Sequence, residues 1–351
     1  MDQAISWLLF IILFFLVWLF ILFIYLTTRK ALENSRHRKI EHYKEKYREV
    51  LFQYLYKGQK SKLLMPDNTI KYAALEELLS DFANVTQGGD LQQRMTTYAE
   101  KYFWEEYTKK LSHRRWSVRM NVLYNIEAFQ MIKFRDKLGE IFENKRKISE
   151  PEEIQLIKLL TKFDHPKLYE YIISSSRIYP DFIYRMLFSE MSETTFNYFL
   201  TKFQDLPNFI KNTIIDVLGI QNRLEYGEFL TKQLKQPDDE LRIRTLKALA
   251  HILYPIPITE IEKHSNSSLF EERIMTLKIC AAVRRNEYIP LLISKMSDPI
   301  FAVRKQAGYS ISRYPNANEI FQEILDTSDD AFAKDMAKEW LERGIDHGNS
   351  T

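Results

Sequence analysis

Twenty consecutive residues without a charged side chain, from Trp7 to Leu26, constrain this chain more than any other feature. A helix rises about 1.5 Å per residue, so the run is about 30 Å long, the thickness of the hydrocarbon core of a bilayer. Trp7 and Tyr25 lie near its two ends, where amphipathic rings favour the membrane interface. The run therefore predicts a single membrane-spanning helix, with Trp7, Tyr25, Arg29 and Lys30 at the interfaces.

A cleaved secretory signal is the competing interpretation of this run. Such signals carry basic residues before a shorter apolar core and small residues at a cleavage site, and the sequence has none of these features. The flank before the run has no Lys or Arg, whereas residues 29–48 after it hold eight. By the positive-inside rule we expect the N-terminus outside and everything after residue 28 in the cytoplasm, in an arrangement that suits a bacterial inner membrane.

The basic character of the chain is confined to the segment that follows the span. Residues 29–62 hold eleven Lys and Arg against four Glu, although the formal net charge of the whole chain is only +3. Cations next to a membrane gain about 1 kcal/mol each from anionic headgroups. We therefore expect residues 29–48 to contact anionic lipid.

The same segment carries an apolar seam. Ile40, Tyr43, Tyr47, Val50 and Tyr54 recur at alternating spacings of three and four residues, as in a coiled coil of two heptads. One interpretation is a homodimer through residues 40–54 or a surface for a membrane partner. The other, which we favour because two heptads are too short to be stable alone, is a helix whose tyrosines dock on the following domain.

Glycine and cysteine usage excludes several classes of protein. Only nine glycines occur in 351 residues, whereas dinucleotide folds, P-loops and barrels need glycine where the backbone adopts positive φ. Cys280 is the only cysteine, so the chain holds no internal disulfide and no paired-cysteine zinc site. These counts predict an all-α fold.

A repeated pattern covers most of the remaining chain. Residues 298–307 read Asp-Pro-Ile-Phe-Ala-Val-Arg-Lys-Gln-Ala, and Asp238 to Arg244 keeps the same spacing of six between Asp and Arg. Comparable positions at 155, 185, 211, 244, 275, 304 and 334 lie 26 to 33 residues apart. This spacing suits a pair of short helices with two turns, and Asp in the turn between the two helices can cap the second helix. The pattern resembles HEAT and HEAT-like repeats.

The resemblance implies an α-solenoid of six to eight stacked helix pairs. It also implies that Asp238 with Arg244, and Asp298 with Arg304, form hydrogen-bonded ladders between adjacent repeats, with Pro299 at the first helical position. Met275 occupies the position that corresponds to Arg304 in this repeated pattern, where an arginine is expected. The predicted domains are a membrane anchor (1–28), a basic juxtamembrane helix (29–62), a helical cap region (63–149), HEAT-like repeats (150–344) and a disordered tail (345–351). Within the cap region we expect helices over 72–82 and 91–110, with a turn at 87–90.

The sequence points to no catalytic, cofactor or metal site. No pair among its seven histidines has metal-ligand spacing, and no nucleophile-elbow, Walker or kinase motif is present. Cys280 lies in an apolar run and is predicted to be a core residue. We therefore expect no cofactor and no enzymatic activity.

By resemblance to HEAT-like proteins, we expect a membrane-tethered cytoplasmic scaffold that binds a protein partner. Tethering favours a partner in the same membrane, such as an envelope or polysaccharide-synthesising enzyme. The first alternative is an enzyme or enzyme subunit, since one branch of HEAT-like proteins resembles bilin-attaching lyases. The second is nucleic-acid binding through the basic clusters of residues 109–119 and 133–147, although residues 63–351 together are slightly acidic and nucleic-acid binding needs many cations on one face.

Overall fold

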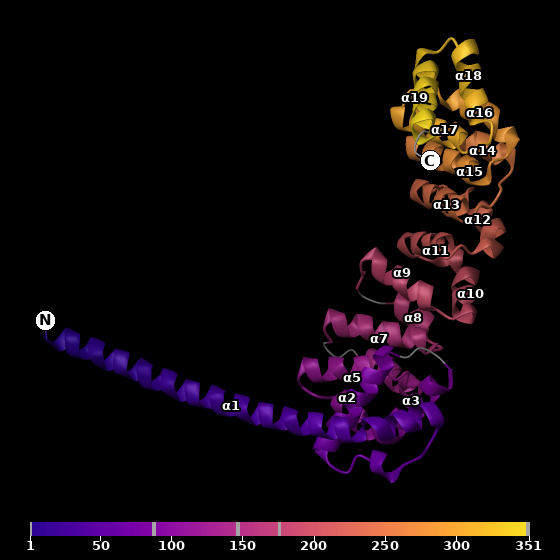
Figure 1. Ribbon diagram of the computed structural model, residues 1–351. Helices are drawn as coiled ribbons and strands as arrows, with labels where there is room; N and C mark the ends of the chain where they lie inside the picture. Colours follow the sequence, from indigo (N-terminus) through magenta and orange to yellow (C-terminus); the bar gives the residue numbers. More distant parts are fainter. Residues whose placement is uncertain (1, 86–88, 145–147, 175–176, 349–351) are drawn as a thin grey trace. The chain divides into compact units, whose positions relative to one another are not determined.

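The computed structural model describes the backbone of residues 2–85, 89–144, 148–174 and 177–348. All regular secondary structure in these ranges is helical (Figure 1), so the prediction of an all-α protein is confirmed. The chain divides into two compact units, residues 1–165 (unit 1) and 166–351 (unit 2).

Unit 1 contains seven α-helices and two short 3-10 helices among its described residues. They are α1 (Asp2–Lys57), η1 (Lys62–Leu64), α2 (Thr69–Val85), α3 (Gly89–Tyr102), α4 (Trp104–Lys110), α5 (Trp116–Ala128), η2 (Ile132–Phe134), α6 (Arg135–Glu143) and α7 (Glu150–Lys162). The predicted helix over 72–82 is part of α2, and that over 91–110 is divided between α3 and α4 at Phe103. Residues 87 and 88 of the predicted turn at 87–90 lie outside the described residues, and residues 89 and 90 begin α3 instead of belonging to a turn.

The longest element, α1, joins the apolar run to the folded part of unit 1 without interruption. No proline or glycine occurs between Asp2 and Lys57, so the sequence supplies neither of the residues that most readily break a helix. The helix ends where Gly58 takes φ +71°, a left-handed conformation that glycine adopts without steric cost. The predicted boundary at residue 28 is therefore not a break in the backbone.

The C-terminal third of α1 packs within unit 1 against α2 and α3. Ile40 and Tyr47 are buried, as are Leu51 and Leu55 on the same face. The guanidinium of Arg94 donates to the carbonyls of Leu55 (2.8 Å) and Tyr56 (2.9 Å), which belong to the last turn of α1. The tyrosine seam of residues 40–54 thus docks on its own domain, which confirms the favoured interpretation.

Unit 2 contains twelve α-helices and three short 3-10 helices among its described residues. They are α8 (Leu168–Ile173), α9 (Asp181–Glu190), α10 (Glu193–Thr201), η3 (Phe203–Asp205), α11 (Asn208–Ile220), η4 (Leu224–Tyr226), α12 (Gly227–Gln233), α13 (Asp239–His251), α14 (Ile258–Ser265), α15 (Phe270–Val283), η5 (Asn286–Tyr288), α16 (Ile289–Lys295), α17 (Phe301–Ser312), α18 (Ala317–Thr327) and α19 (Ala331–Gly348).

The helices of unit 2 are stacked in sequence order. Each of α9, α11, α13, α15 and α17 contacts the next odd-numbered helix, and α12, α14, α16 and α18 each pack on the helix that follows them. The stack is tight at Gly219 of α11, where a Cβ atom would lie only 2.9 Å from Cα of Ala248 in α13. Side chains from successive helices therefore share one continuous apolar core.

Two predicted boundaries differ from those in the structure. Helix α7 packs on α5 and α6 and belongs to unit 1, whereas the sequence places its start at residue 150 among the later repeats. Helix α19 continues to Gly348, so residues 345–348 of the predicted tail are helical, and residues 349–351 lie outside the described residues.

Candidate interaction surfaces

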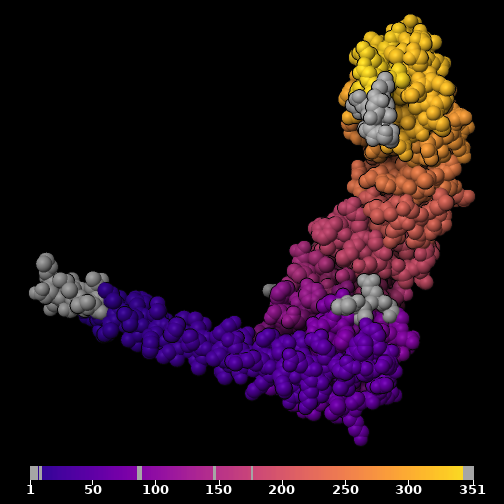
Figure 2. Space-filling view, in the orientation of Figure 1, coloured from indigo at the N-terminus to yellow at the C-terminus, as the bar shows by residue number. Residues whose placement is uncertain are grey.

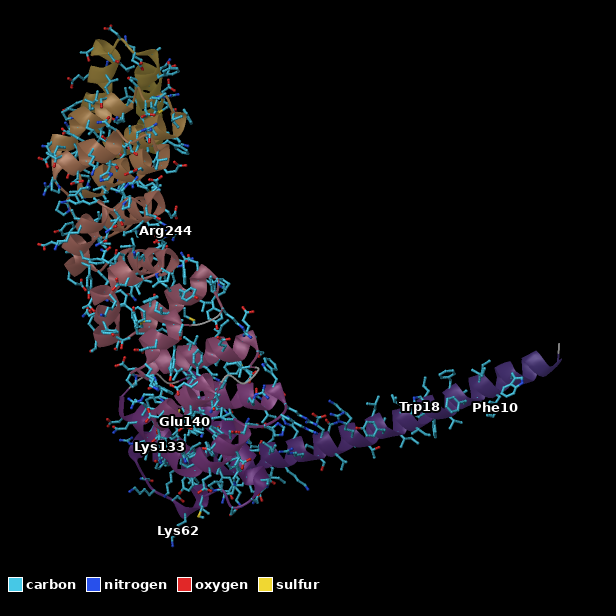
Figure 3. The ribbon with its side chains drawn as sticks, turned by 180° about the vertical axis from the view of Figure 1, so that it is seen from behind. Phe10, Trp18, Lys62, Lys133, Glu140 and Arg244 are labelled. Atoms are coloured by element: carbon cyan, nitrogen blue, oxygen red, sulfur yellow. The ribbon has the colours of Figure 1, made fainter. Side chains whose placement is uncertain are left out.

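No other part of unit 1 covers the apolar part of α1 (Figure 2). Trp7 is 69% exposed and Tyr25 is 59% exposed, and every residue from Phe10 to Leu26 is exposed. Figure 3 shows Phe10 and Trp18 projecting from this free segment. Among the described residues, α1 is the one helix long and apolar enough to cross a membrane, and none of its most apolar window is buried. Helix α1 is therefore a candidate membrane span.

The basic flank beside this span is also free. Arg29 and Lys30 are exposed, and so are Arg36, Arg38, Lys39, Lys46 and Arg48, none of which forms an ion pair among the described residues. Lys44 alone is engaged, with its Nζ atom 3.2 Å from carboxylate oxygens of Glu41 and Asp81. Burial by itself would lower the pKa of Lys44, but hydrogen bonds to these two carboxylates raise it above its usual value. Lys44 therefore fastens α1 to α2.

Four arginines repeat one hydrogen-bond pattern along the chain. Each donates through Nη1 to the backbone carbonyls six and five residues before it: Arg119 to His113 and Arg114, Arg242 to Gln236 and Pro237, Arg273 to Ser267 and Ser268, and Arg304 to Asp298 and Pro299. Each guanidinium thus holds the turn that precedes its own helix. The last three are separated by intervals of 31 residues.

The same arginines also reach the next helix or turn. The Nε atom of Arg119 in α5 lies 2.6 Å from a carboxylate oxygen of Glu152 in α7. The Nε atom of Arg242 in α13 lies 3.1 Å from a carboxylate oxygen of Glu272 in α15. The Nη2 atom of Arg273 donates to Asp298 at 3.0 Å. These contacts link the helix of each arginine to a later helix or turn, and the series is called here the arginine ladder.

The predicted repeat residues take different places in this ladder. Asp298 and Arg304 belong to it, and Pro299 contributes a carbonyl acceptor at an exposed position just before α17. Asp238 instead caps α13 by accepting from the Leu241 amide at 2.7 Å. Arg244, which is labelled in Figure 3, pairs with Glu240 and with Asp216 of α11 and does not belong to the ladder.

The arginines that sequence analysis missed are Arg242 and Arg273. The Asp-to-Arg spacing of six points to Arg244, and the Thr-Leu-Lys run that recurs 31 residues later points to Met275. Both positions lie two residues beyond the arginines of the ladder. The signal that identifies Arg242 and Arg273 is the 31-residue interval counted back from Arg304.

Glu272 is a buried carboxylate of unit 2 with three side-chain partners. It is 2% exposed and accepts from Arg242, from the Ser267 hydroxyl at 2.8 Å and from Nδ1 of buried His264 at 2.5 Å. Burial alone would raise the pKa of Glu272, but hydrogen bonds from these three side chains hold it below its usual value. The carboxylate is therefore ionised at neutral pH.

We expect Glu272→Gln to destabilise unit 2 by about 2 kcal/mol at pH 7, since hydrogen bonds to charged groups contribute about 1.5–3 kcal/mol each. A lowered folded-state pKa means that the wild-type contribution is present above the unfolded pKa and is lost as pH falls through the folded pKa. Urea unfolding between pH 7 and pH 3 should show the two proteins converging below about pH 4.5. A constant difference across this range would contradict the assignment.

No group of three or more His, Cys, Asp or Glu side chains that could hold a metal ion lies together in the described residues. Cys280 is buried, and burial raises the pKa of its thiol to about 12, so the thiolate that a nucleophile requires is not populated at neutral pH.

The basic clusters of unit 1 are paired in part, because exposed Lys109, Arg114 and Arg115 form no ion pair among the described residues. Lys137 lies 2.7 Å from Glu140 and Arg135 lies 3.0 Å from Asp136, while Lys133 lies over the Trp104 ring at 4.9 Å. Lys110 lies 3.8 Å from Glu106. Residues 145–147 of the predicted cluster lie outside the described residues.

Concave surfaces occur on the long helices of both units. The unit 1 surface has a polar lining that includes Ser80, Tyr124 and Asn125. The unit 2 surface, about 380 Å³ in volume, runs across α13, α15 and α17. Concave surfaces between stacked helices are where partner segments commonly dock.

Comparison with known proteins gives no family. No family model matches the chain, and no curated protein matches it. Two engineered proteins of known crystal structure are similar at 15% identity each: one with TM-score 0.29, over 68% of this chain and 94% of that chain, the other with TM-score 0.25, over 78% and 79%. Structural similarity at these TM-scores gives no information about function.

Proposed function

We propose that the protein is a membrane-tethered scaffold that holds a protein partner at the cytoplasmic face of a cell membrane. The observation that carries the proposal is the continuity of α1, which joins an exposed apolar segment of membrane length to a folded helical unit without a break in the helix. A continuous helix of this kind holds unit 1 at a set height above the bilayer.

The proposed topology has one span, the N-terminus outside and both units in the cytoplasm. It is supported by seven exposed, unpaired cations between Arg29 and Arg48, against none before the span. These cations also suit contact with anionic headgroups.

We further propose that unit 2 is a HEAT-like α-solenoid. The support is the 31-residue interval of Arg242, Arg273 and Arg304 together with the sequential contacts of the long helices. Such arrays present extended surfaces to other proteins. The proposed partner lies in the same membrane, for example an envelope or polysaccharide-synthesising enzyme. Binding to such a partner is favoured because tethering in one membrane raises the effective concentration of the two proteins.

Crosslinking in intact membranes tests this function. Full-length tagged protein is crosslinked, purified in mild detergent and analysed by mass spectrometry beside a chain truncated after residue 62, which keeps the anchor and basic flank. We expect a membrane protein to be recovered by the full chain and to be absent with the truncated one. Recovery of the same proteins by both, or of self-crosslinks alone, would overturn the scaffold proposal.

A further inference from the structure

The concave surface of unit 2 has a lining that repeats with the helices. Nine residues form it: Lys247, Ala250 and His251 of α13, Lys278, Ala281 and Ala282 of α15, and Gln306, Tyr309 and Arg313 of α17. Positions 247, 278 and 309 are related by the 31-residue interval, as are 251, 282 and 313. The three helices therefore contribute equivalent faces to one surface, called here the α13–α17 groove.

The groove is basic although the unit that carries it is acidic. Residues 166–351 hold 23 Lys and Arg against 26 Asp and Glu, a net charge of −3, yet no carboxylate lines the groove. Lys247, Lys278 and Arg313 are exposed and form no ion pair among the described residues. By contrast, Arg242 and Arg244 of α13 form ion pairs with carboxylates. Three of the free cations on or next to α13, α15 and α17 thus line the hollow, whereas exposed Lys305 and Arg284 lie outside it.

The floor of the groove is apolar. Ala250, Ala281 and Ala282 have small side chains that let a ligand approach the helices closely. Tyr309 is 44% exposed. The centroid of its ring lies 6.1 Å from that of the Trp340 ring, so Tyr309 lies beside a second aromatic side chain. A ligand that places carboxylates among the cations can therefore rest its apolar atoms on alanine and on the Tyr309 ring.

We propose that the α13–α17 groove binds an acidic segment of a protein partner. This inference rests on the proposed scaffold function and names the chemistry by which unit 2 recognises what it holds. Charge complementarity carries it: two lysines, one arginine and a histidine converge on a site without a carboxylate. A nucleic acid fits less well, because three permanent cations neutralise few phosphates and the alanine floor offers no further charge.

The test uses full-length protein in nanodiscs of phosphatidylcholine and a fluorescein-labelled peptide of alternating Glu and Ala. The groove variant is Lys247→Gln/Lys278→Gln/Arg313→Gln. The matched control is Lys232→Gln/Lys235→Gln/Lys263→Gln, which removes three exposed, unpaired lysines on or beside α12 and α14, outside the groove. All six positions are exposed, so equal thermal unfolding of the two variants is expected and is checked by circular dichroism.

We expect the groove variant to bind the peptide about tenfold more weakly than wild type, because three exposed charge pairs contribute a few tenths to 1 kcal/mol each. The control variant should bind within about twofold of wild type. A Gln-Ala peptide should not bind. Tyr309→Ala should weaken binding without changing its salt dependence, since it removes contact area and no charge.

Equal loss of affinity in the two triple variants would overturn the inference, as would tighter groove-dependent binding of single-stranded oligonucleotide than of peptide. Crosslinking in membranes separates this inference from the scaffold proposal. If the groove variant still recovers the partner, the groove is wrong and the scaffold stands. If full-length protein recovers no partner although peptide binding depends on the groove, the scaffold proposal fails and the groove stands.

Discussion

Replacing Phe15 and Trp18 together by aspartate should move the protein from the membrane pellet to the soluble fraction. Both side chains are about 60% exposed on the free part of α1 and lie near the middle of the apolar run. Each charge at the centre of a span costs about 2.5–3.5 kcal/mol on insertion scales, so two should lower partitioning more than a thousandfold. The measurement is the fraction of protein left in the pellet after an alkaline carbonate wash.

The matched control is Phe15→Leu/Trp18→Leu, which keeps the segment apolar and should stay in the pellet. Retention of the aspartate variant after the wash would mean that another part of the chain anchors it. An N-terminal tag reports on cleavage, because loss of the tag would identify the apolar run as a signal. Orientation is read from Asp2→Cys and Gln59→Cys: an impermeant maleimide should label only the first in intact cells, since natural Cys280 is buried.

Arg273→Ala should destabilise unit 2 by about 3–5 kcal/mol, the usual cost of leaving one member of a buried ion pair without its partner. The Arg273 side chain is 10% exposed and that of Asp298 is 4% exposed. The guanidinium donates to Asp298 and to the carbonyls of Ser267 and Ser268. Its loss therefore leaves a buried carboxylate and loosens the turn before α15. Urea unfolding followed by circular dichroism measures the change.

Two further variants show whether the cost comes from the stranded charge. Arg273→Met/Asp298→Ala should recover part of the stability, because both charges are removed together. Arg285→Ala breaks an exposed ion pair with Glu287 and should leave the unfolding midpoint unchanged. If Arg273→Ala behaves like Arg285→Ala, the arginine ladder does not stabilise the stack.

The elements that the sequence predicts well are those set by local chemistry. The apolar run and the scarcity of glycine lead to the exposed helix and to an all-α chain because they need no tertiary information. Docking of residues 40–54 on unit 1 follows from the shortness of the seam, since two heptads need other support.

The sequence predicts the arginine ladder poorly because two arginines compete for it in one helix. Arg242 and Arg244 lie two residues apart, and the spacing from Asp238 favours Arg244. The choice depends on which guanidinium faces the carbonyls of the preceding turn, and that is decided by packing of α13 on its neighbours. The α13–α17 groove cannot be predicted from the sequence for a similar reason. Single lysines 31 residues apart form one basic surface only when their helices stack.

The absence of a break in α1 also has a mechanical consequence. In the proposed arrangement, the eleven residues 29–39 between the span and the first buried side chain, Ile40, form a stalk about 16 Å long. A helix conveys rotation as well as distance, since each residue turns the chain by about 100°. The azimuth at which unit 1 faces its neighbours in the membrane is therefore set by the number of residues in this stalk, and a tilt or twist of the span is passed directly to the folded unit.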